Sequence, residues 1–152
     1  MKPRIYIDTS VIGGCVDSEF QVASLRLIRA ILSGRATMVL SELTARELAP
    51  APVAVKEILA GIPSSNLEYL SFSAEADDLA QAYLLEHVVT PSFSADALHI
   101  AHATVARVDV LVSWNFRHIV NLQRIHAFNA VNLKRGYPLL EIRSPLEVFA
   151  DE

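Results

Sequence analysis

The chain has 152 residues, a length that suits one domain able to bury a core without disulfide bridges or a structural metal ion. Hydrophobic residues make up 52% of it and the mean hydropathy is +0.33, which excludes a disordered chain and suits a sheet covered by helices on both faces. The formal net charge of −4 and the pI of 5.7 exclude a protein that holds nucleic acid through bulk positive charge alone.

The hydrophobic pattern of the first half predicts alternating strands and helices. Apolar residues recur at helical spacing from Val22 to Ile31, and Gly34 ends that pattern. Short runs without this spacing predict buried strands. We expect a strand at residues 4–8, a loop marked by Gly13 and Gly14, a helix at 20–32, a strand at 37–40, and helices at 41–49 and 53–60.

The second half continues the alternation after a turn-rich break at residues 61–66. We expect a strand at 67–72, a helix at 74–88, a lead-in at 91–94 to a helix at 95–107, a strand at 109–113, a helix at 121–134 and a last short strand at 139–143. Strands that alternate with helices imply right-handed crossovers and a mainly parallel sheet. The pattern therefore predicts an α/β fold, with residues 1–152 forming one domain.

The positions of the cysteine and of the charged residues predict the compartment. Cys15 cannot form a bridge within the chain, and an aspartate interrupts residues 1–10 before any apolar signal core develops. Charged residues or histidines also break every apolar run short of the roughly 18 residues of a membrane span. We expect a soluble, cytoplasmic protein that makes no contact with a membrane.

Four polar residues are expected at one edge of the sheet. In parallel sheets, sites lie at the carboxyl ends of the strands, where the helices begin. Asp8 ends the first strand, Glu47 lies in the helix after the second, Asp96 lies in the first turn of the helix at 95–107, and Asn115 follows the strand at 109–113. Asp109 fails this criterion because it lies at the entry end of its strand.

Carboxylates held close together predict a bound cation. Like charges raise each other's pKa, and a metal ion removes the conflict. Oxygen ligands without cysteine thiolates favour Mg²⁺ or Mn²⁺ over zinc. Such an ion orients and acidifies an attacking water and offsets charge on phosphoryl oxygens, and a second ion can join when substrate binds. The pattern is typical of phosphodiester hydrolysis.

Each of these residues also has a purely structural interpretation. Asp96 in a first helical turn favours the helix dipole, and residues 44–47 fit a capping box that would account for Glu47. Asn115 is a common turn residue after a strand. Asp8 is harder to explain structurally, because a carboxylate that ends a buried strand is costly without a partner.

Two histidines and one further acid stand near these residues. His99 and His102 lie three residues apart on one expected helix, and without a further Cys or His cluster they are interpreted as packing or surface residues. Glu42, beside an expected cap at Ser41, is the reserve ligand in place of Glu47.

Four segments resemble, in order, the successive motifs of the PIN domain family. They are IYIDTSVIGG at 5–14, SELTARELA at 41–49, SADALHIAHA at 94–103 and LVSWNFRHI at 111–119. The resemblance continues through residues 129–149 and so covers almost the whole chain. It implies a three-layer sandwich with a central, mainly parallel sheet of four to five strands flanked by helices.

The resemblance also implies a function. Members of the family are Mg²⁺- or Mn²⁺-dependent ribonucleases, and many bacterial members are VapC-type toxins of toxin–antitoxin pairs that form homodimers. RNA would then be the substrate and a cognate antitoxin a possible partner. Asp8, Glu47 and Asp96 match the three main acids of the family.

The fourth motif departs from the family pattern. Many members carry another acid at the place of Asn115 or three residues on, where this chain has His118. Asn115 would then act as a neutral ligand or through water, with a weaker hold on the metal ion. Thr9 or Ser10 is expected to add a hydroxyl to the ion's hydration shell, and Arg117 to meet a phosphate.

Two other functions fit parts of the pattern. The altered fourth motif favours a catalytically weak or inactive PIN-like module that binds RNA or protein, while the three retained acids oppose this. A phosphatase or dehalogenase with an aspartate nucleophile also places an Asp at the end of strand one, but that chemistry usually has a second Asp two residues later, where Ser10 stands.

Overall fold

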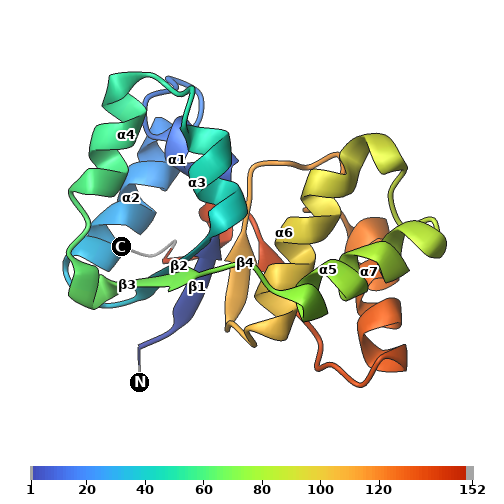
Figure 1. Ribbon diagram of the computed structural model, residues 1–152. Coiled ribbons are helices and arrows are strands. Elements are labelled where there is room, and N and C mark those ends of the chain that lie inside the picture. The colour runs from blue at the N-terminus through green and yellow to red at the C-terminus, as the bar shows by residue number, and fades with distance from the viewer. Residues whose placement is uncertain (1, 150–152) are drawn as a thin grey trace.

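The computed structural model describes residues 2–149, and its centre is a sheet of five strands (Figure 1). Every neighbouring pair of strands is parallel, in the order β3-β2-β1-β4-β5. The strands are β1 (Arg4–Ile7), β2 (Thr37–Ser41), β3 (Leu67–Leu70), β4 (Val110–Val112) and β5 (Ile142–Arg143). The expected α/β fold with a central parallel sheet is therefore confirmed.

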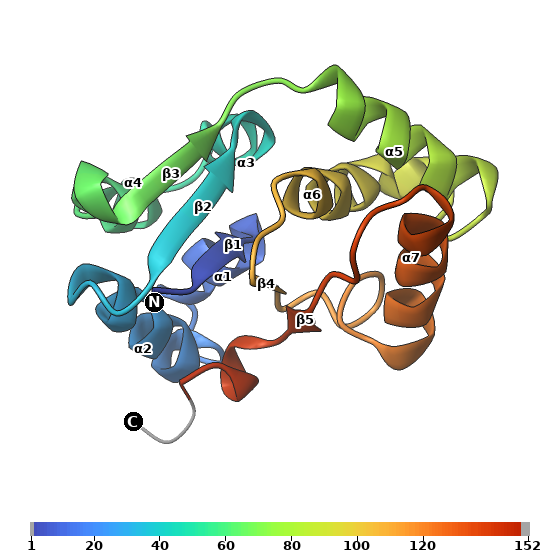
Figure 2. The same ribbon diagram turned by 90° about the horizontal axis from the view of Figure 1, so that it is seen from below.

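Helices cover both faces of this sheet and give three layers (Figure 2). Helices α1, α2 and α4 pack on one face, and α5, α6 and α7 pack on the other. Their bounds are α1 (Thr9–Gly14), α2 (Gln21–Leu32), α3 (Glu42–Leu48), α4 (Val53–Ala60), α5 (Ala74–Leu85), α6 (Ser94–Val105) and α7 (Leu122–Lys134). None of the helices within residues 2–149 is long and apolar enough to cross a membrane.

Alternation along β1 explains why the core has two halves. Successive side chains of a strand point to opposite faces, so Ile5 and Ile7 join the half under α2, whereas Tyr6 joins the half under α6. All three side chains are buried. Full burial of an aliphatic side chain contributes about 1.5–3 kcal/mol, which makes β1, covered on both faces, a central element of the fold.

The expected loop at Gly13 and Gly14 is wrong, because both glycines lie inside α1. At Gly14 the packing leaves no space for a side chain. A β-carbon there would stand 2.6 Å from Ser24 Oγ and 2.9 Å from Trp114 Nε1, closer than real atoms approach. A β-carbon on Gly13 would meet nothing within 4 Å.

Several element ends differ from the expected ones by a few residues. The helix expected to reach residue 88 ends at Leu85, and His87 then adopts a positive φ of 59°. The last strand keeps only residues 142–143, since β4, its neighbour, is itself only three residues long. Three short 3₁₀ turns occupy loops, at Ser64–Asn66, Pro91–Phe93 and Pro145–Glu147.

The topology places a reversal of strand order at β1. From β1 the chain adds β2 and β3 on one side of the sheet and β4 and β5 on the other. Open parallel sheets bind ligands where the strand order reverses in this way, outside the carboxyl ends of the strands. That position lies between the ends of β1 and β4. At the opposite edge, the backbone N–H of Arg4 donates to the carboxylate of Asp109 over 2.7 Å, so Asp109 lies away from that position as expected.

Candidate metal centre

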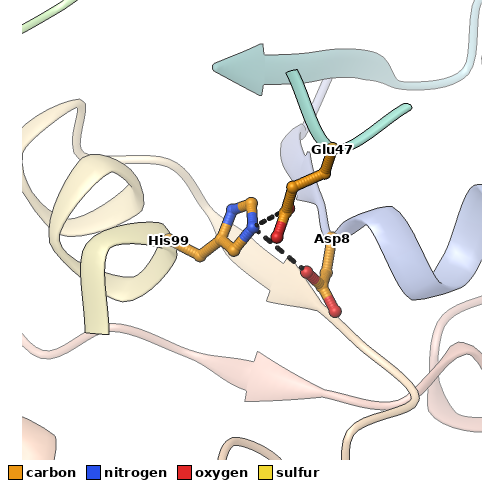
Figure 3. Close-up of side chains that lie close together, drawn as sticks. All are labelled: Asp8, Glu47 and His99. Atoms are coloured by element: carbon orange, nitrogen blue, oxygen red, sulfur yellow. Dashed lines mark hydrogen bonds and ion pairs between the residues drawn. The ribbon is translucent and has the colours of Figure 1, made fainter. Parts of the chain in front are cut away.

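Asp8, Glu47 and His99 meet near the carboxyl end of β1 from three different elements (Figure 3). Asp8 directly follows β1, Glu47 lies in the last turn of α3, and His99 lies in the second turn of α6. One ligand atom from each lies within 4.8 Å of the other two. Segments far apart in the sequence thus bring two carboxylates and one imidazole within reach of a single ion.

Two serine hydroxyls fix the carboxylate of Asp8. Ser10 Oγ and Ser113 Oγ each donate to Asp8 Oδ2 over 2.8 Å. The serines are themselves held, because Ser10 Oγ accepts from the backbone N–H of Trp114 at 3.0 Å and Ser113 Oγ accepts from that of Asn115 at 2.9 Å. The other oxygen, Asp8 Oδ1, faces His99 Nε2 at 3.6 Å. This arrangement orients one oxygen of a buried carboxylate toward the shared position.

Glu47 contributes the more exposed carboxylate of the group. Its Oε1 accepts from Thr9 Oγ1 at 2.7 Å and from His99 Nε2 at 2.6 Å, while its side chain is 33% exposed. Partial burial acts to raise the pKa of Glu47, but the hydrogen bond and charge of His99, with the Thr9 bond, hold it below its usual range. Glu47 therefore carries a negative charge near neutral pH.

The capping interpretation of Glu47 is wrong. Ser41 is the N-cap of α3, and its Oγ accepts from the backbone N–H of Thr44, so the box expected at residues 44–47 does not form. The side chain of Glu47 instead turns to Thr9 and His99.

His99 is almost fully buried and is held on both ring nitrogens. Its Nδ1 shares a hydrogen bond of 2.7 Å with the hydroxyl of Tyr6, which shares another of 2.7 Å with Ser41 Oγ. Burial acts to lower the pKa of His99, but the hydrogen bond to Glu47 and the negative charges of Asp8, Glu47 and Asp96 raise it overall. The pKa of the His99 ring therefore depends on the negative charges of the neighbouring carboxylates.

Interpreting His99 as a packing or surface residue missed this contact. One signal was present in the sequence. His99 follows Asp96 by three residues, a spacing that puts both on one face of a helix. His102, one turn further on, is buried and lines a cavity with Phe72 and Ser73.

Asp96 lies beside this group without belonging to its tightest part. It is partly buried in the first turn of α6. Burial raises the pKa of Asp96, the charges of Asp8 and Glu47 raise it further, and His99 and His118 oppose them. Asp96 thus shares the electrostatic environment of the other two carboxylates.

The fourth motif forms a hydrogen-bonded turn at the end of β4. Asn115 Oδ1 accepts from the backbone N–H of His118 over 2.9 Å. The ring of His118 is buried and stacks on Phe93 with 3.7 Å between centroids, whereas Arg117 is exposed. Asn115 and His118 are therefore engaged with the chain itself, and Arg117 presents its charge to solvent.

Thr9 and Ser10 lie in the site, whereas Glu42, the reserve ligand, does not. Thr9 and Ser10 each donate to a carboxylate of the site, so both position an acid. Glu42 lines the cavity beside His102 and stands outside the group formed by Asp8, Glu47 and His99. Sequence reasoning also did not identify Ser113, whose role depends on the pairing of β1 with β4.

The donor set fits a divalent cation. Mg²⁺ and first-row transition ions accept carboxylate oxygens as ligands in proteins, and transition ions also accept imidazole nitrogen. The site offers both kinds of ligand, and hydroxyls hold the carboxylates by hydrogen bonds. Asp8 is buried and the other two acids are partly buried, so a cation offsets charge that water cannot fully screen.

Residues 5–117 match the family described as PIN domain. No curated protein matches the chain. The fold is similar to that of DNA-bound VapBC from Salmonella typhimurium, with 19% identity, a TM-score of 0.58, and 95% of this chain and 99% of that chain covered.

Two further structures share the fold. VapBC2 from Rickettsia felis, bound to a DNA fragment from its promoter, is 16% identical, with a TM-score of 0.57 over 93% of this chain and 98% of that one. Mycobacterium tuberculosis VapC20, a Sarcin-Ricin loop cleaving toxin, is also 16% identical, with a TM-score of 0.58 over 90% and 98%. These likenesses show a common fold.

Proposed function

This chain belongs to the PIN domain family, a nuclease-type family, and from that premise we propose that it is a metal-dependent endoribonuclease that hydrolyses RNA phosphodiester bonds. The observation that carries the proposal is the convergence of Asp8 and Glu47, with Asp96 beside them, at the strand-order reversal of the sheet. Carboxylates gathered at such a position fit phosphodiester hydrolysis, because like charges held together favour the binding of a cation.

The three acids would hold Mg²⁺ or Mn²⁺. Such an ion, when bound, supplies a more acidic, oriented water and offsets charge that develops on the phosphoryl group. The protein contributes rigidity at Asp8, which Ser10 and Ser113 both hold, while Glu47 accepts one hydrogen bond from Thr9. A carboxylate held in one orientation, as that of Asp8 is, needs no rearrangement when the ion binds.

Other residues would handle the RNA. Arg117 is exposed on the turn that follows β4, where its guanidinium can pair with a phosphate. Asn115 stands where many family members have an acid, and it would contribute a neutral oxygen or amide contact. Its replacement of a charge predicts weaker metal binding than a complete set of four acids gives.

The biological role proposed is that of a toxin. Structures with this fold include VapBC complexes from Rickettsia felis and Salmonella typhimurium, and VapC20 is described as a Sarcin-Ricin loop cleaving toxin. We propose a cytoplasmic toxin, homodimeric, with a cognate antitoxin protein as its partner. Expression of the chain alone should arrest growth, and co-expression of a small antitoxin encoded beside it should relieve the arrest; unaffected growth would contradict the toxin role.

A cleavage assay tests the enzymatic proposal. Purified protein is incubated with single-stranded RNA and Mn²⁺ or Mg²⁺, with EDTA as the metal-free arm. We expect cleavage by the natural chain and a loss of at least a hundredfold in Asp8→Asn. Asp78→Asn, which removes an exposed carboxylate on α5, is the matched control and should cleave normally. Equal cleavage by the natural chain and Asp8→Asn would show contamination and end the proposal.

One observation favours a second candidate, a PIN-like module that binds RNA or protein and cleaves weakly or not at all. Asn115 lacks the charge of the usual fourth acid, and its Oδ1 is turned toward the backbone of His118. In this case RNA binding would persist in EDTA and Asp8→Asn would leave it unchanged. Cleavage that depends on both Mn²⁺ and Asp8 would exclude it.

A further inference from the structure

We propose that His99 supplies a nitrogen ligand to the divalent ion, next to Asp8 and Glu47, and that the centre therefore prefers Mn²⁺ and related transition ions to Mg²⁺. The inference rests on the proposed function of the same site and names the chemistry of its cofactor. The three side chains converge on one position, with His99 Nε2 lying 2.6 Å from Glu47 Oε1 and 3.6 Å from Asp8 Oδ1 (Figure 3).

At these distances the three side chains need to move only slightly when an ion binds. Ligand atoms about 2.1 Å from a shared ion lie roughly 3–4 Å from one another. The separation of His99 Nε2 from Asp8 Oδ1 is already in that range. The contact between His99 and Glu47 must lengthen, and Glu47, one-third exposed in the last turn of α3, is the side chain with room to move.

His99 cannot easily turn away from this position. Its side chain is 1% exposed, and its ring packs edge-on against Tyr6 with 5.7 Å between centroids. The hydroxyl of Tyr6 holds Nδ1 at 2.7 Å. Ligating histidines usually have their second ring nitrogen fixed by such a bond, which sets the tautomer and the ring orientation.

The hydrogen-bond chain behind the ring can reverse without moving a heavy atom. In one state the Tyr6 hydroxyl donates to His99 Nδ1, and Nε2–H donates to Glu47. In the other, the ring is the opposite neutral tautomer: Nε2 has given its proton to water by way of the partly exposed Glu47, and Nδ1 has taken up the proton of the Tyr6 hydroxyl, which is replaced along the hydroxyl chain. Nδ1–H then donates to Tyr6, whose hydroxyl donates to Ser41, and Nε2 offers its lone pair to an ion. Both hydroxyls can donate and accept, so the distances of 2.7 Å along the chain suit either state.

A nitrogen ligand changes which ion the site selects. Mg²⁺ prefers oxygen ligands and water in an octahedral shell, whereas first-row transition ions also bind imidazole nitrogen, with an affinity that is lowest for Mn²⁺ and rises through iron to nickel and copper. A site built from carboxylates alone has no such preference. With His99 as a ligand, Mn²⁺ gains a bond that Mg²⁺ uses poorly.

The test measures the bound ion directly, without RNA. Mn²⁺ is added to the full chain, and pulsed electron paramagnetic resonance detects nitrogen bound to it. We expect a ¹⁴N coupling that changes to a ¹⁵N coupling when only the histidines are isotopically labelled. This measurement needs no substitution, so it does not depend on whether a variant folds.

Variants then identify the histidine. His99→Gln should abolish the coupling and lower Mn²⁺ affinity at least tenfold, while Mg²⁺ affinity changes by less than about twofold. Tyr6→Phe removes the bond that orients the ring and should lower Mn²⁺ affinity about 10- to 100-fold. His102→Gln, the matched control one turn further along α6, should bind both ions normally. Circular dichroism verifies that each variant is folded.

The outcomes separate this inference from the function on which it rests. Mn²⁺ bound without histidine coupling, or coupling that survives in His99→Gln, would overturn the ligand assignment and leave a carboxylate-bound nuclease intact. Equal losses of Mn²⁺ and Mg²⁺ affinity in His99→Gln would overturn the preference. RNA cleavage that persists in EDTA would instead overturn the metal-dependent function, and the inference with it.

Discussion

Substituting Ser113 by alanine tests how the fold holds its most buried site carboxylate. Ser113 is fully buried immediately after β4, and its hydroxyl makes two short hydrogen bonds besides a longer one of 3.5 Å with Ser10 Oγ. It donates to Asp8 Oδ2 over 2.8 Å and accepts from the backbone N–H of Asn115 over 2.9 Å. Ser113→Ala removes these bonds and leaves Ser10 as the remaining hydroxyl donor to that oxygen.

The expected cost follows from the kind of bond that is lost. A hydrogen bond to a charged group contributes about 1.5–3 kcal/mol to stability, roughly twice a neutral one. Asn115 is partly exposed, so water can replace the bond to its N–H, and its loss adds no more than about 1 kcal/mol. We expect the free energy of unfolding to fall by about 1.5–4 kcal/mol in total, or the Tm by roughly 3–16 °C for a chain of this size.

A double-mutant cycle isolates the charged bond. Urea unfolding in EDTA is followed by far-UV circular dichroism and by the fluorescence of Trp114, the only tryptophan. In Asp8→Asn the partner of Ser113 is neutral, so adding Ser113→Ala should cost about 1–2 kcal/mol less than it does in the natural chain. Ser33→Ala, which removes a hydroxyl bonded to the end of α2, is the control and should change stability by less than about 0.5 kcal/mol.

Two results would refute this reasoning. If Ser113→Ala unfolds at the same urea concentration as the natural chain, the serine does not stabilise the carboxylate. If its cost is the same with Asp8 and with Asn at that position, the serine acts through packing alone. In the assay with Mn²⁺ we also expect Ser113→Ala to bind the ion about 10- to 100-fold more weakly, because the orientation of Asp8 is lost.

Three further changes test the electrostatics and packing around the site. Burial first, and then the charge of Asp8, raise the pKa of Asp96, so the folded chain loses stability as pH rises from the ordinary value of 3.8 through the raised one. Asp96→Asn should therefore unfold at higher urea than the natural chain at pH 7 in EDTA, with the difference shrinking toward pH 4; a less stable variant at pH 7 would contradict this. Gly14→Ala forces a β-carbon against Ser24 and Trp114 and should cost about 1–3 kcal/mol in urea unfolding, whereas Gly13→Ala should be neutral or stabilising, and equal effects would contradict the packing role. Glu68→Gln breaks the ion pair with Arg4 at the edge away from the site, and should cost no more than about 1 kcal/mol and leave RNA cleavage unchanged; lost cleavage would show coupling between the two edges.

The strands and most helices were predictable because each is encoded locally. The helix expected at residues 53–60 has the same bounds as α4. The strand expected at 37–40 is one residue shorter than β2, which ends at Ser41. Such runs bury apolar side chains at a fixed spacing, which the sequence displays directly. The short helix α1 was missed because its glycines suggested a loop, while the reason for Gly14 is a contact with α2 and Trp114 that only the folded chain reveals.

Only those features of the candidate site that follow from the topology of the sheet were predictable. A parallel sheet brings the carboxyl ends of its strands to one edge, so Asp8 and Glu47 could be placed together from their positions in the sequence. The partners of their carboxylates could not, because Ser113 meets Asp8 through the pairing of β1 with β4. Asp8 and Ser113 are 105 residues apart, and no local pattern connects them.

The charges gathered at the site indicate why it takes up a cation. Asp8 and Glu47 stand in contact with a single imidazole, and Asp96 adds a third carboxylate whose pKa is raised by burial and then by their charges. One histidine can offset at most one of these charges. The folded chain therefore retains excess negative charge at a partly buried site, where the effective dielectric constant is lower than in water and each charge acts more strongly. A divalent ion removes that excess, so the negative charge that disfavours the ionised form of Asp96 in the metal-free fold also provides affinity for the ion.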